Sequence, residues 1–208
     1  MHLLAQLEAG ELDLVLVAEF DGAPLAFPPQ ARHVVLVERE PALVAMAEHH
    51  PLASREPLRL ADLADQWWAV QGLSEHGERE AFTAACRAAG FVPRVRHVTD
   101  DVSLARRAVT SGQAVLTVLP QSAERGGYVL RALEGEPLHR RLHLAWQPDR
   151  VPIPSEELLA AVRSGYAAHT AANRAFAQWW AANGWTDSDR SDRSDRSDRS
   201  DRSDRQVG

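Results

Sequence analysis

The first hydrophobic residues of the chain follow a helical spacing and then form a strand-like run. Leu3, Leu4 and Leu7 lie on one face of an amphipathic helix, and Gly10 is the expected residue just past its end. Residues 12–17 (LDLVLV) are typical of a strand buried on both faces of a parallel sheet. Helix, glycine and strand form the second half of a βαβ unit, which needs a strand before the helix. We therefore expect the chain to begin in the middle of a fold.

Helical and strand-like patterns then alternate along the body of the chain. After a loop at 20–30, strands are expected at 33–37, 42–47, 67–70, 94–98, 114–119 and 141–146, with the charged residues 38–40 between the first two. Helices are expected at 60–64, 78–89 and 102–111, and from 155, with a break, towards Trp180. This alternation predicts an α/β protein.

Polar residues mark the starts of two of these helices. Asp100 or Asp101 is a natural N-cap for the helix at 102–111, because its carboxylate can accept from free amides in the first turn. Ser155 is expected to cap the last long helix, with Glu156 and Glu157 in its first turn.

Composition limits the class of protein. The 208 residues are 45% hydrophobic, enough to bury a sizeable core in one or two lobes. No run of about 18 apolar residues predicts a transmembrane helix, and the N-terminus does not resemble a secretory signal. The net charge of −6 favours neither nucleic acid nor an anionic membrane as partner. Together with a single cysteine, Cys86, these features indicate a cytoplasmic protein without a disulfide framework.

The C-terminal end has a different composition. Residues 188–205 are consecutive Ser-Asp-Arg triplets, which contain no apolar side chain to bury. We expect residues 187–208 to form a disordered tail rather than a domain.

Four blocks of sequence, in order, resemble the effector-binding domain of LysR-type transcriptional regulators. They are LLAQLEAGELDLVLV, LVAMAEHHPLA with LRLADLADQ, VTDDVSLARRAVTSGQAVLTVLP, and RRLHLAWQPDRVPIPSEELLAAVR. The resemblance covers about residues 3–172. The family's N-terminal winged helix-turn-helix, linker helix and first regulatory strand and helix have no counterpart here. Ala114 stands where the family usually has a glycine.

The resemblance implies a two-lobed α/β fold like that of type 2 periplasmic binding proteins, truncated at its N-terminus. Lobe I would hold residues 1–48 and 138–186, and lobe II with the hinge crossings would hold residues 49–137. A small-molecule effector would bind between the lobes, without a cofactor. Self-association is expected, since the intact family forms dimers or tetramers, and DNA would be bound only through the domain missing from this chain.

The expected effector contacts lie at the carboxyl ends of strands, where open α/β sheets bind ligands. They are Ala18, Glu19, His33, Gln71, Ser74, Glu75, His76, Thr99 and Asp100. Simpler roles compete with several of these. Asp100 can be a helix cap, and Ser74 can be a cap or a loop residue.

The charge of this region affects which chemical class of effector fits. Free amides at a helix N-terminus suit a carboxylate, and effectors of the family are often small carboxylates. Glu75, Glu78 and Glu80 place negative charge on the same helix end. A neutral, amine-bearing or aromatic effector therefore fits as well as an acid.

Other functions have less support in the sequence. A transport-type solute-binding protein of the same fold would normally carry a signal sequence. An enzyme would need a catalytic motif, and neither G-x-S-x-G, H-E-x-x-H, a Walker loop nor a dinucleotide glycine fingerprint occurs. Two histidine pairs, His49 with His50 and His139 with His143, have no third ligand in the sequence pattern. We therefore predict no metal site.

Overall fold

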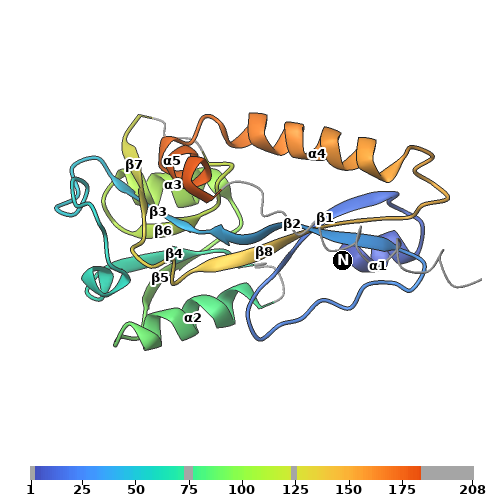
Figure 1. Ribbon diagram of the computed structural model, residues 1–208. Coiled ribbons are helices and arrows are strands. Elements are labelled where there is room, and N and C mark those ends of the chain that lie inside the picture. Colours follow the sequence, from blue (N-terminus) through green and yellow to red (C-terminus); the bar gives the residue numbers. More distant parts are fainter. Residues whose placement is uncertain (1–2, 73–76, 123–125, 184–208) are drawn as a thin grey trace, which may run out of the picture.

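The computed structural model describes residues 3–72, 77–122 and 126–183, which form two β-sheets with helices packed on their faces (Figure 1). The expected disordered tail, residues 187–208, lies outside the described residues. Helices and strands alternate along the chain, as predicted for an α/β protein.

The first sheet has the order β1-β8-β2, built from β1 (Leu14–Glu19), β8 (His139–Trp146) and β2 (Arg32–Pro41). Both pairs are antiparallel. The expectation that the opening strand is buried on both faces of a parallel sheet is therefore wrong. β1 forms an edge of this sheet, and Leu16 on it is 41% exposed. β2 also runs through residues 38–40, which the sequence pattern had placed between strands.

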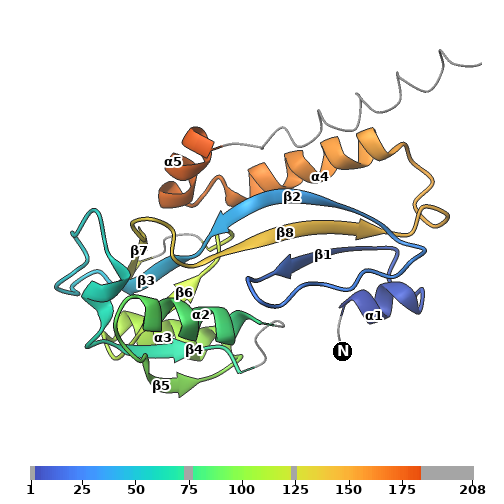
Figure 2. The same cartoon turned by 60° about the horizontal axis from the view of Figure 1, so that its bottom comes forward.

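Alternation along β8 directs its side chains to opposite faces of the first sheet. Leu142, Leu144 and Trp146 pack with leucines of α4 (Ser155–Thr170). Ala145 packs with α1 (Leu3–Glu8) and the valines of β1. The two helices accordingly lie on either side of the sheet (Figure 2).

The second sheet has the order β5-β4-β6-β3-β7. Its strands are β5 (Arg94–Val98), β4 (Trp67–Val70), β6 (Val115–Val118), β3 (Leu43–Ala47) and β7 (Tyr128–Ala132). β4 runs parallel to both β5 and β6, whereas β3 is antiparallel to β6 and β7. The expected lobe boundary at residue 48 is too late, because β3 pairs within this second sheet.

Helices cover both faces of the second sheet, and a short 3-10 helix (Leu60–Leu63) leads into β4. Trp68 packs on one face with Phe82 and Cys86 of α2 (Glu78–Ala88). Ala69, the next residue along β4, packs on the other face with Ala108 of α3 (Val102–Thr110). The carboxyl ends of β4, β5 and β6 are thereby framed by two helices.

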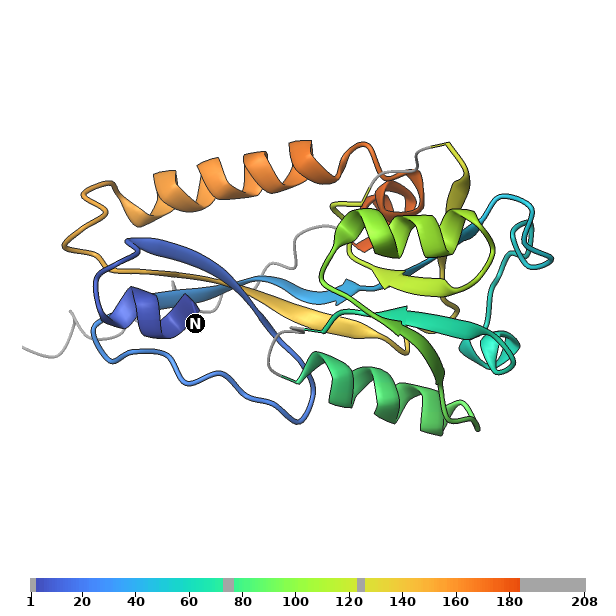
Figure 3. The ribbon, with the colours of Figure 1, turned by 180° about the vertical axis from the view of Figure 1, so that it is seen from behind.

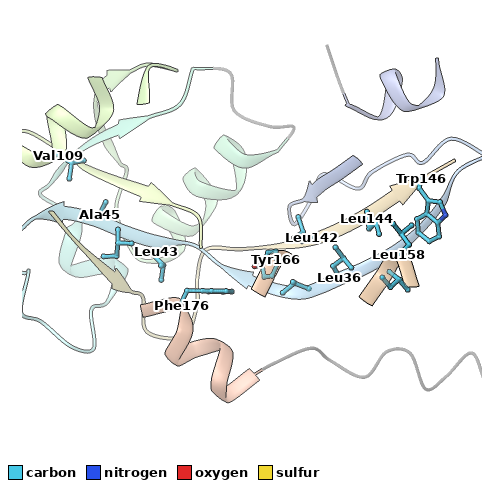
Figure 4. Packing of buried hydrophobic residues seen from close by; sticks show 13 residues of the cluster. Leu36, Leu43, Ala45, Val109, Leu142, Leu144, Trp146, Leu158, Tyr166 and Phe176 are labelled. Carbon is cyan, nitrogen blue, oxygen red and sulfur yellow. The ribbon is translucent and has the colours of Figure 1, made fainter. Parts of the chain in front are cut away.

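One hydrophobic cluster connects the two sheets (Figure 4). It joins Leu43 and Leu130 of the second sheet to Leu142 of the first, with Tyr166 of α4 and Phe176 of α5 (Arg174–Asn183). α4 runs along the first sheet towards the second, where α5 contacts β7 (Figure 3). The two lobes therefore share a continuous core rather than meeting only at two hinge strands.

The helix ends test the capping predictions. Asp101 is the N-cap of α3, where its carboxylate accepts from the amides of Ser103 and Leu104. The prediction for Ser155 is wrong, because α4 begins at Ser155 itself, after Pro154, without a side-chain cap. The Ser155 hydroxyl instead accepts from Arg32.

The predicted break in the last helix is confirmed between α4 and α5. Asn173 lies in the break and is buried. Its side chain donates to the Pro120 carbonyl (3.1 Å) and accepts from the Phe176 amide (3.0 Å). These bonds satisfy the free end of α5 and tie it to the segment after β6.

Candidate functional site

Two cavities lie at the carboxyl ends of the parallel strands, the edge at which open α/β sheets bind ligands. The larger, about 300 Å³, is bounded by α3 and is called here the α3 cavity. The smaller, about 270 Å³, is bounded by α2 and is called the α2 cavity. They meet at Glu78 and at residues 117–119, which contribute to the walls of both.

The α3 cavity collects three of the predicted effector contacts. Gln71 follows β4, whereas Thr99 and Asp100 follow β5, and all three line this cavity. Its apolar wall comes from α3 and β6, including Ala105, Val109 and Leu116. Segments far apart in sequence thus contribute polar and apolar groups to one cavity, the usual composition of a small-molecule site.

Hydrogen bonds hold the loops that carry these residues in position. The Thr99 amide donates to the Val70 carbonyl (3.0 Å), and its hydroxyl accepts from the Asp101 amide (3.1 Å). Gly72 lies so close to Asp100 that a Cβ on it would be 2.9 Å from Oδ2 of that carboxylate. A glycine at position 72 therefore lets the loops after β4 and β5 approach each other.

The sequence analysis missed several polar residues of the α3 cavity. Gln121, Ser122, Arg106 and Tyr128 also line it. The Gln121 Oε1 atom is buried without a hydrogen-bond partner among the described residues. The guanidinium of Arg106 lies over the Tyr128 ring, 5.6 Å from its centroid. Gln121 and Ser122 follow β6, so the end of the strand predicted at 114–119 was a signal that could have found them. Arg106 on α3 and Tyr128 on β7 gave no such local signal, because only the fold brings them to this cavity.

The α2 cavity lies between the lobes. Phe20 and Asp21, which follow β1, form one side, and Ala81 and Ala85 of α2 form the opposite side. The two segments that connect the lobes complete the walls with residues 40, 42 and 137–140.

A buried polar network closes the end of the α2 cavity. The Glu40 carboxylate is fully buried and accepts from Arg140 Nε and from the Tyr166 hydroxyl. Arg140 is 7% exposed. Burial raises the pKa of the Tyr166 hydroxyl above its ordinary value, and the negative charge of Glu40 raises it further, so the phenol stays protonated and donates.

Three of the other predicted contacts lie elsewhere. Ala18 and Glu19 end β1 just before the residues that enter the α2 cavity, but neither lines a cavity described here. The Glu19 carboxylate pairs with Arg141. His33 stacks on Phe27, with ring centroids 3.9 Å apart. The remaining three, Ser74, Glu75 and His76, lie outside the described residues.

His143 adds an unusual group beside Glu19. It is 5% exposed, and within the described part of the chain neither ring nitrogen has a hydrogen-bond partner. Its Nε2 atom lies 3.7 Å from a Glu19 carboxylate oxygen. Burial lowers the pKa of His143, and the positive charge of Arg141 acts in the same direction, while the Glu19 charge opposes them.

Other chemistries can be assessed for the described residues 3–72, 77–122 and 126–183. No group of three or more His, Cys, Asp or Glu side chains there is arranged to hold a metal ion. Cys86 is buried under α2, and burial raises the pKa of its thiol to about 12. Among the same residues, no helix is long and apolar enough to span a bilayer.

The chain belongs to the LysR substrate binding domain family, whose model matches residues 1–179. Among its curated relatives, the small neutral protease regulatory protein of Streptomyces coelicolor is 41% identical over 143 residues. That match covers 69% of this chain and 43% of the relative. The DNA-binding transcriptional dual regulator OxyR of Escherichia coli is 30% identical over 175 residues, covering 81% of this chain and 54% of that protein. The chain therefore spans about half the length of these relatives.

Solved structures agree with this assignment. The C-terminal domain of a probable LysR family regulator from Rhodococcus sp. RHA1 is 29% identical, with a TM-score of 0.57 over 78% of each chain. The effector binding domain of BenM with its effector benzoate is 18% identical, with a TM-score of 0.60, covering 82% of this chain and 76% of that one. The second likeness supports the fold alone. The predicted two-lobed fold of the LysR effector-binding domain is thereby confirmed.

Proposed function

We propose that this chain is the effector-sensing part of a transcriptional regulator and that its effector binds in the α3 cavity. The observation that carries the proposal is the meeting of Gln71, Thr99 and Asp100 at one cavity, from loops that follow two different strands. The family and its relatives, which are regulatory proteins, support a sensing role rather than catalysis. DNA would be contacted through a separate part of the intact protein, in the cytoplasm.

The lining of the α3 cavity favours an effector that donates N–H groups. Glu78, Asp100 and Asp101 carry negative charge there, and Arg106 is the one cationic side chain among the described residues that line the cavity. The buried Oε1 atom of Gln121 is an acceptor without a partner among the described residues, and a ligand donor would satisfy it. A cationic amine or a neutral amide therefore matches this cavity better than a carboxylate does.

The shared core offers a route from the α3 cavity to the rest of the molecule. Val109 of α3 lines the cavity and also belongs to the cluster that contains Tyr166 and Phe176. A ligand that moves α3 would change packing in this cluster and thus the placement of α4 and α5. In an oligomer, such a change would alter how the subunits are presented to DNA.

Thiol chemistry has little support in this chain. Cys86 is the only cysteine, so no intrachain disulfide can form. Its thiol is buried with a raised pKa, which disfavours the reactive thiolate. We propose a binding effector rather than an oxidant as the signal.

A thermal-shift screen of small amines, amides and carboxylates tests the function. A ligand of the α3 cavity should raise the melting temperature of the wild-type protein. Thr99→Ala and Gln71→Ala should each weaken its binding about tenfold, which corresponds to the loss of one hydrogen bond. Thr83→Ala on α2 is the matched control, because Thr83 lines neither cavity. A ligand bound equally well by all three variants would refute the site.

A further inference from the structure

We propose that His139 is a proton-sensitive switch between the lobes, which exchanges Arg39 for Asp21 as its partner when its ring becomes protonated. This inference goes beyond effector binding and does not depend on the α3 cavity. It rests on the hydrogen bonds of the His139 ring, on a carboxylate near the same ring nitrogen, and on the contacts of the segment that carries this carboxylate.

The partners of His139 define the protonation state of its ring. Arg39 Nη1 lies 2.9 Å from His139 Nε2, and the Glu136 carbonyl oxygen lies 3.1 Å from Nδ1. A guanidinium can only donate, and a carbonyl can only accept. Nε2 therefore accepts from Arg39 while Nδ1 donates to Glu136, an arrangement that only the neutral ring can make.

Arg39 is held beside His139 by further bonds. Its Nε atom donates to the Glu136 carboxylate (3.0 Å), and its Nη2 atom donates to the Glu136 carbonyl (3.0 Å). The same carboxylate accepts from the Trp179 indole of α5. A proton on Nε2 would place two positively charged donors against each other. Protonation therefore removes the bond between His139 and Arg39.

Asp21 is the alternative partner of the ring. Its Oδ2 atom lies 3.4 Å from the same Nε2 atom of His139. A carboxylate can only accept, so it can bond Nε2 only when this nitrogen carries a proton. The Asp21 side chain is 84% exposed, which leaves it room to move towards the ring. One nitrogen thus faces a partner for each of its two states.

The other charges near His139 favour the protonated ring. Glu40 and Arg140 lie in the connections between the lobes and pair with each other. Glu78 of α2 lines the same cavity as His139 and adds negative charge to it. Among the described residues that line this cavity, Arg140 is the one arginine. Arg39 is therefore the cation that keeps the ring neutral.

Asp21 belongs to a turn that touches both lobes. The turn follows β1 and is closed by a bond from the Ala23 amide to the Phe20 carbonyl (3.0 Å). Gly77, the N-cap of α2, packs so closely against Ala23 that a side chain at position 77 would overlap it. His139 lies in the second connection between the lobes. A pair of His139 with Asp21 would therefore tie the turn to this connection and favour one placement of the lobes.

NMR of the histidine rings in the full chain measures the titration, with His139→Gln and His169→Gln to identify the signals. Asp21→Asn should move the midpoint of the His139 titration down by about 0.3–0.5 pH unit, because it removes the carboxylate of an exposed pair. Arg39→Met should move the midpoint up by a similar amount, because it removes the opposing cation. His169, exposed on α4, is the internal control and should titrate unchanged in both variants.

Distances between spin labels report the placement of the lobes. Arg87→Cys on α2 and Ala160→Cys on α4 introduce exposed labelling sites, whereas Cys86 is buried. Between pH 8 and pH 6 the ratio of the placements should change about threefold, which is the linkage equivalent of about 0.5 pH unit. Asp21→Asn and His139→Gln should each abolish this change. Circular dichroism at both pH values shows that each variant is folded.

Three results would overturn the proposal. They are an unchanged His139 midpoint in Asp21→Asn or Arg39→Met, distances that do not depend on pH, and a pH-dependent change that persists in His139→Gln. The last result would assign the response to another group. None of these measurements involves the α3 cavity, so the two proposals can fail separately.

Discussion

Arg140→Met should destabilise the protein strongly, because it leaves the Glu40 carboxylate buried without its cationic partner. Glu40 is fully buried, and the Arg140 side chain is 8% exposed. Breaking a buried pair by removing one partner costs roughly 3–5 kcal/mol. The Tyr166 hydroxyl still donates to Glu40, which places the expected loss of unfolding free energy near the lower end, about 3 kcal/mol.

Replacing the whole network separates the cost of an unpaired charge from the net value of the pair. Glu40→Leu/Arg140→Met/Tyr166→Phe removes every polar member and substitutes apolar groups of similar size. Such replacements are often neutral or stabilising. The triple variant should therefore recover most of the stability lost in Arg140→Met, even though it makes fewer interactions.

Urea unfolding followed by circular dichroism measures these differences, provided that a single transition is seen. Arg150→Met is the matched control, since the pair of Arg150 with Asp13 is half exposed and should contribute roughly 0–1 kcal/mol. The reasoning fails if Arg140→Met costs no more than Arg150→Met. It also fails if the triple variant is less stable than Arg140→Met.

Three further predictions concern single groups. Asp101→Ala should lower the free energy of unfolding by about 1 kcal/mol, because α3 loses its N-cap. In the same urea assay, the control Asp149→Ala, at an exposed site, should change this free energy little. Cys86 should react slowly with Ellman's reagent at pH 8 in the folded protein and rapidly in urea; fast reaction without denaturant would contradict its burial. Stability should fall as the pH drops below about 6.5, since unfolded His143 takes up a proton there while the folded pKa is lowered. His143→Phe should reduce this loss of stability at low pH, whereas the control His169→Phe, at an exposed position, should not. An unchanged pH profile in His143→Phe would show that His143 is not the group responsible.

Much of the local structure followed from the sequence pattern. The helices at 78–89 and 102–111 and the strands at 67–70 and 94–98 were predicted within a residue or two of their observed ends. The cap at Asp101 and the break before α5 were also predicted. These features depend on neighbours within one or two turns of the chain, so composition and spacing suffice to locate them.

The candidate site was predictable only in part. Gln71, Thr99 and Asp100 could be named because each follows a strand of recognisable pattern, and parallel strands place their carboxyl ends along one edge. Arg106 and Arg140 carried no such mark. Each is an ordinary polar residue in the sequence, and its role depends on which distant elements pack around it.

By itself, the sequence determined the α/β class, most of the helices and strands in their order, and the resemblance to the LysR effector-binding domain. The strand β7 was not predicted. Only the tertiary structure decided which strands pair. Residues 12–17 read as a fully buried parallel strand, yet β1 forms an edge antiparallel to β8, and β3 joins the second sheet instead of the first. An apolar run predicts that a strand is buried, but it does not predict which strand it pairs with, because pairing depends on long-range packing and register. The same long-range packing places the Gln121 acceptor, which has no partner among the described residues, in the α3 cavity, where it can meet a ligand.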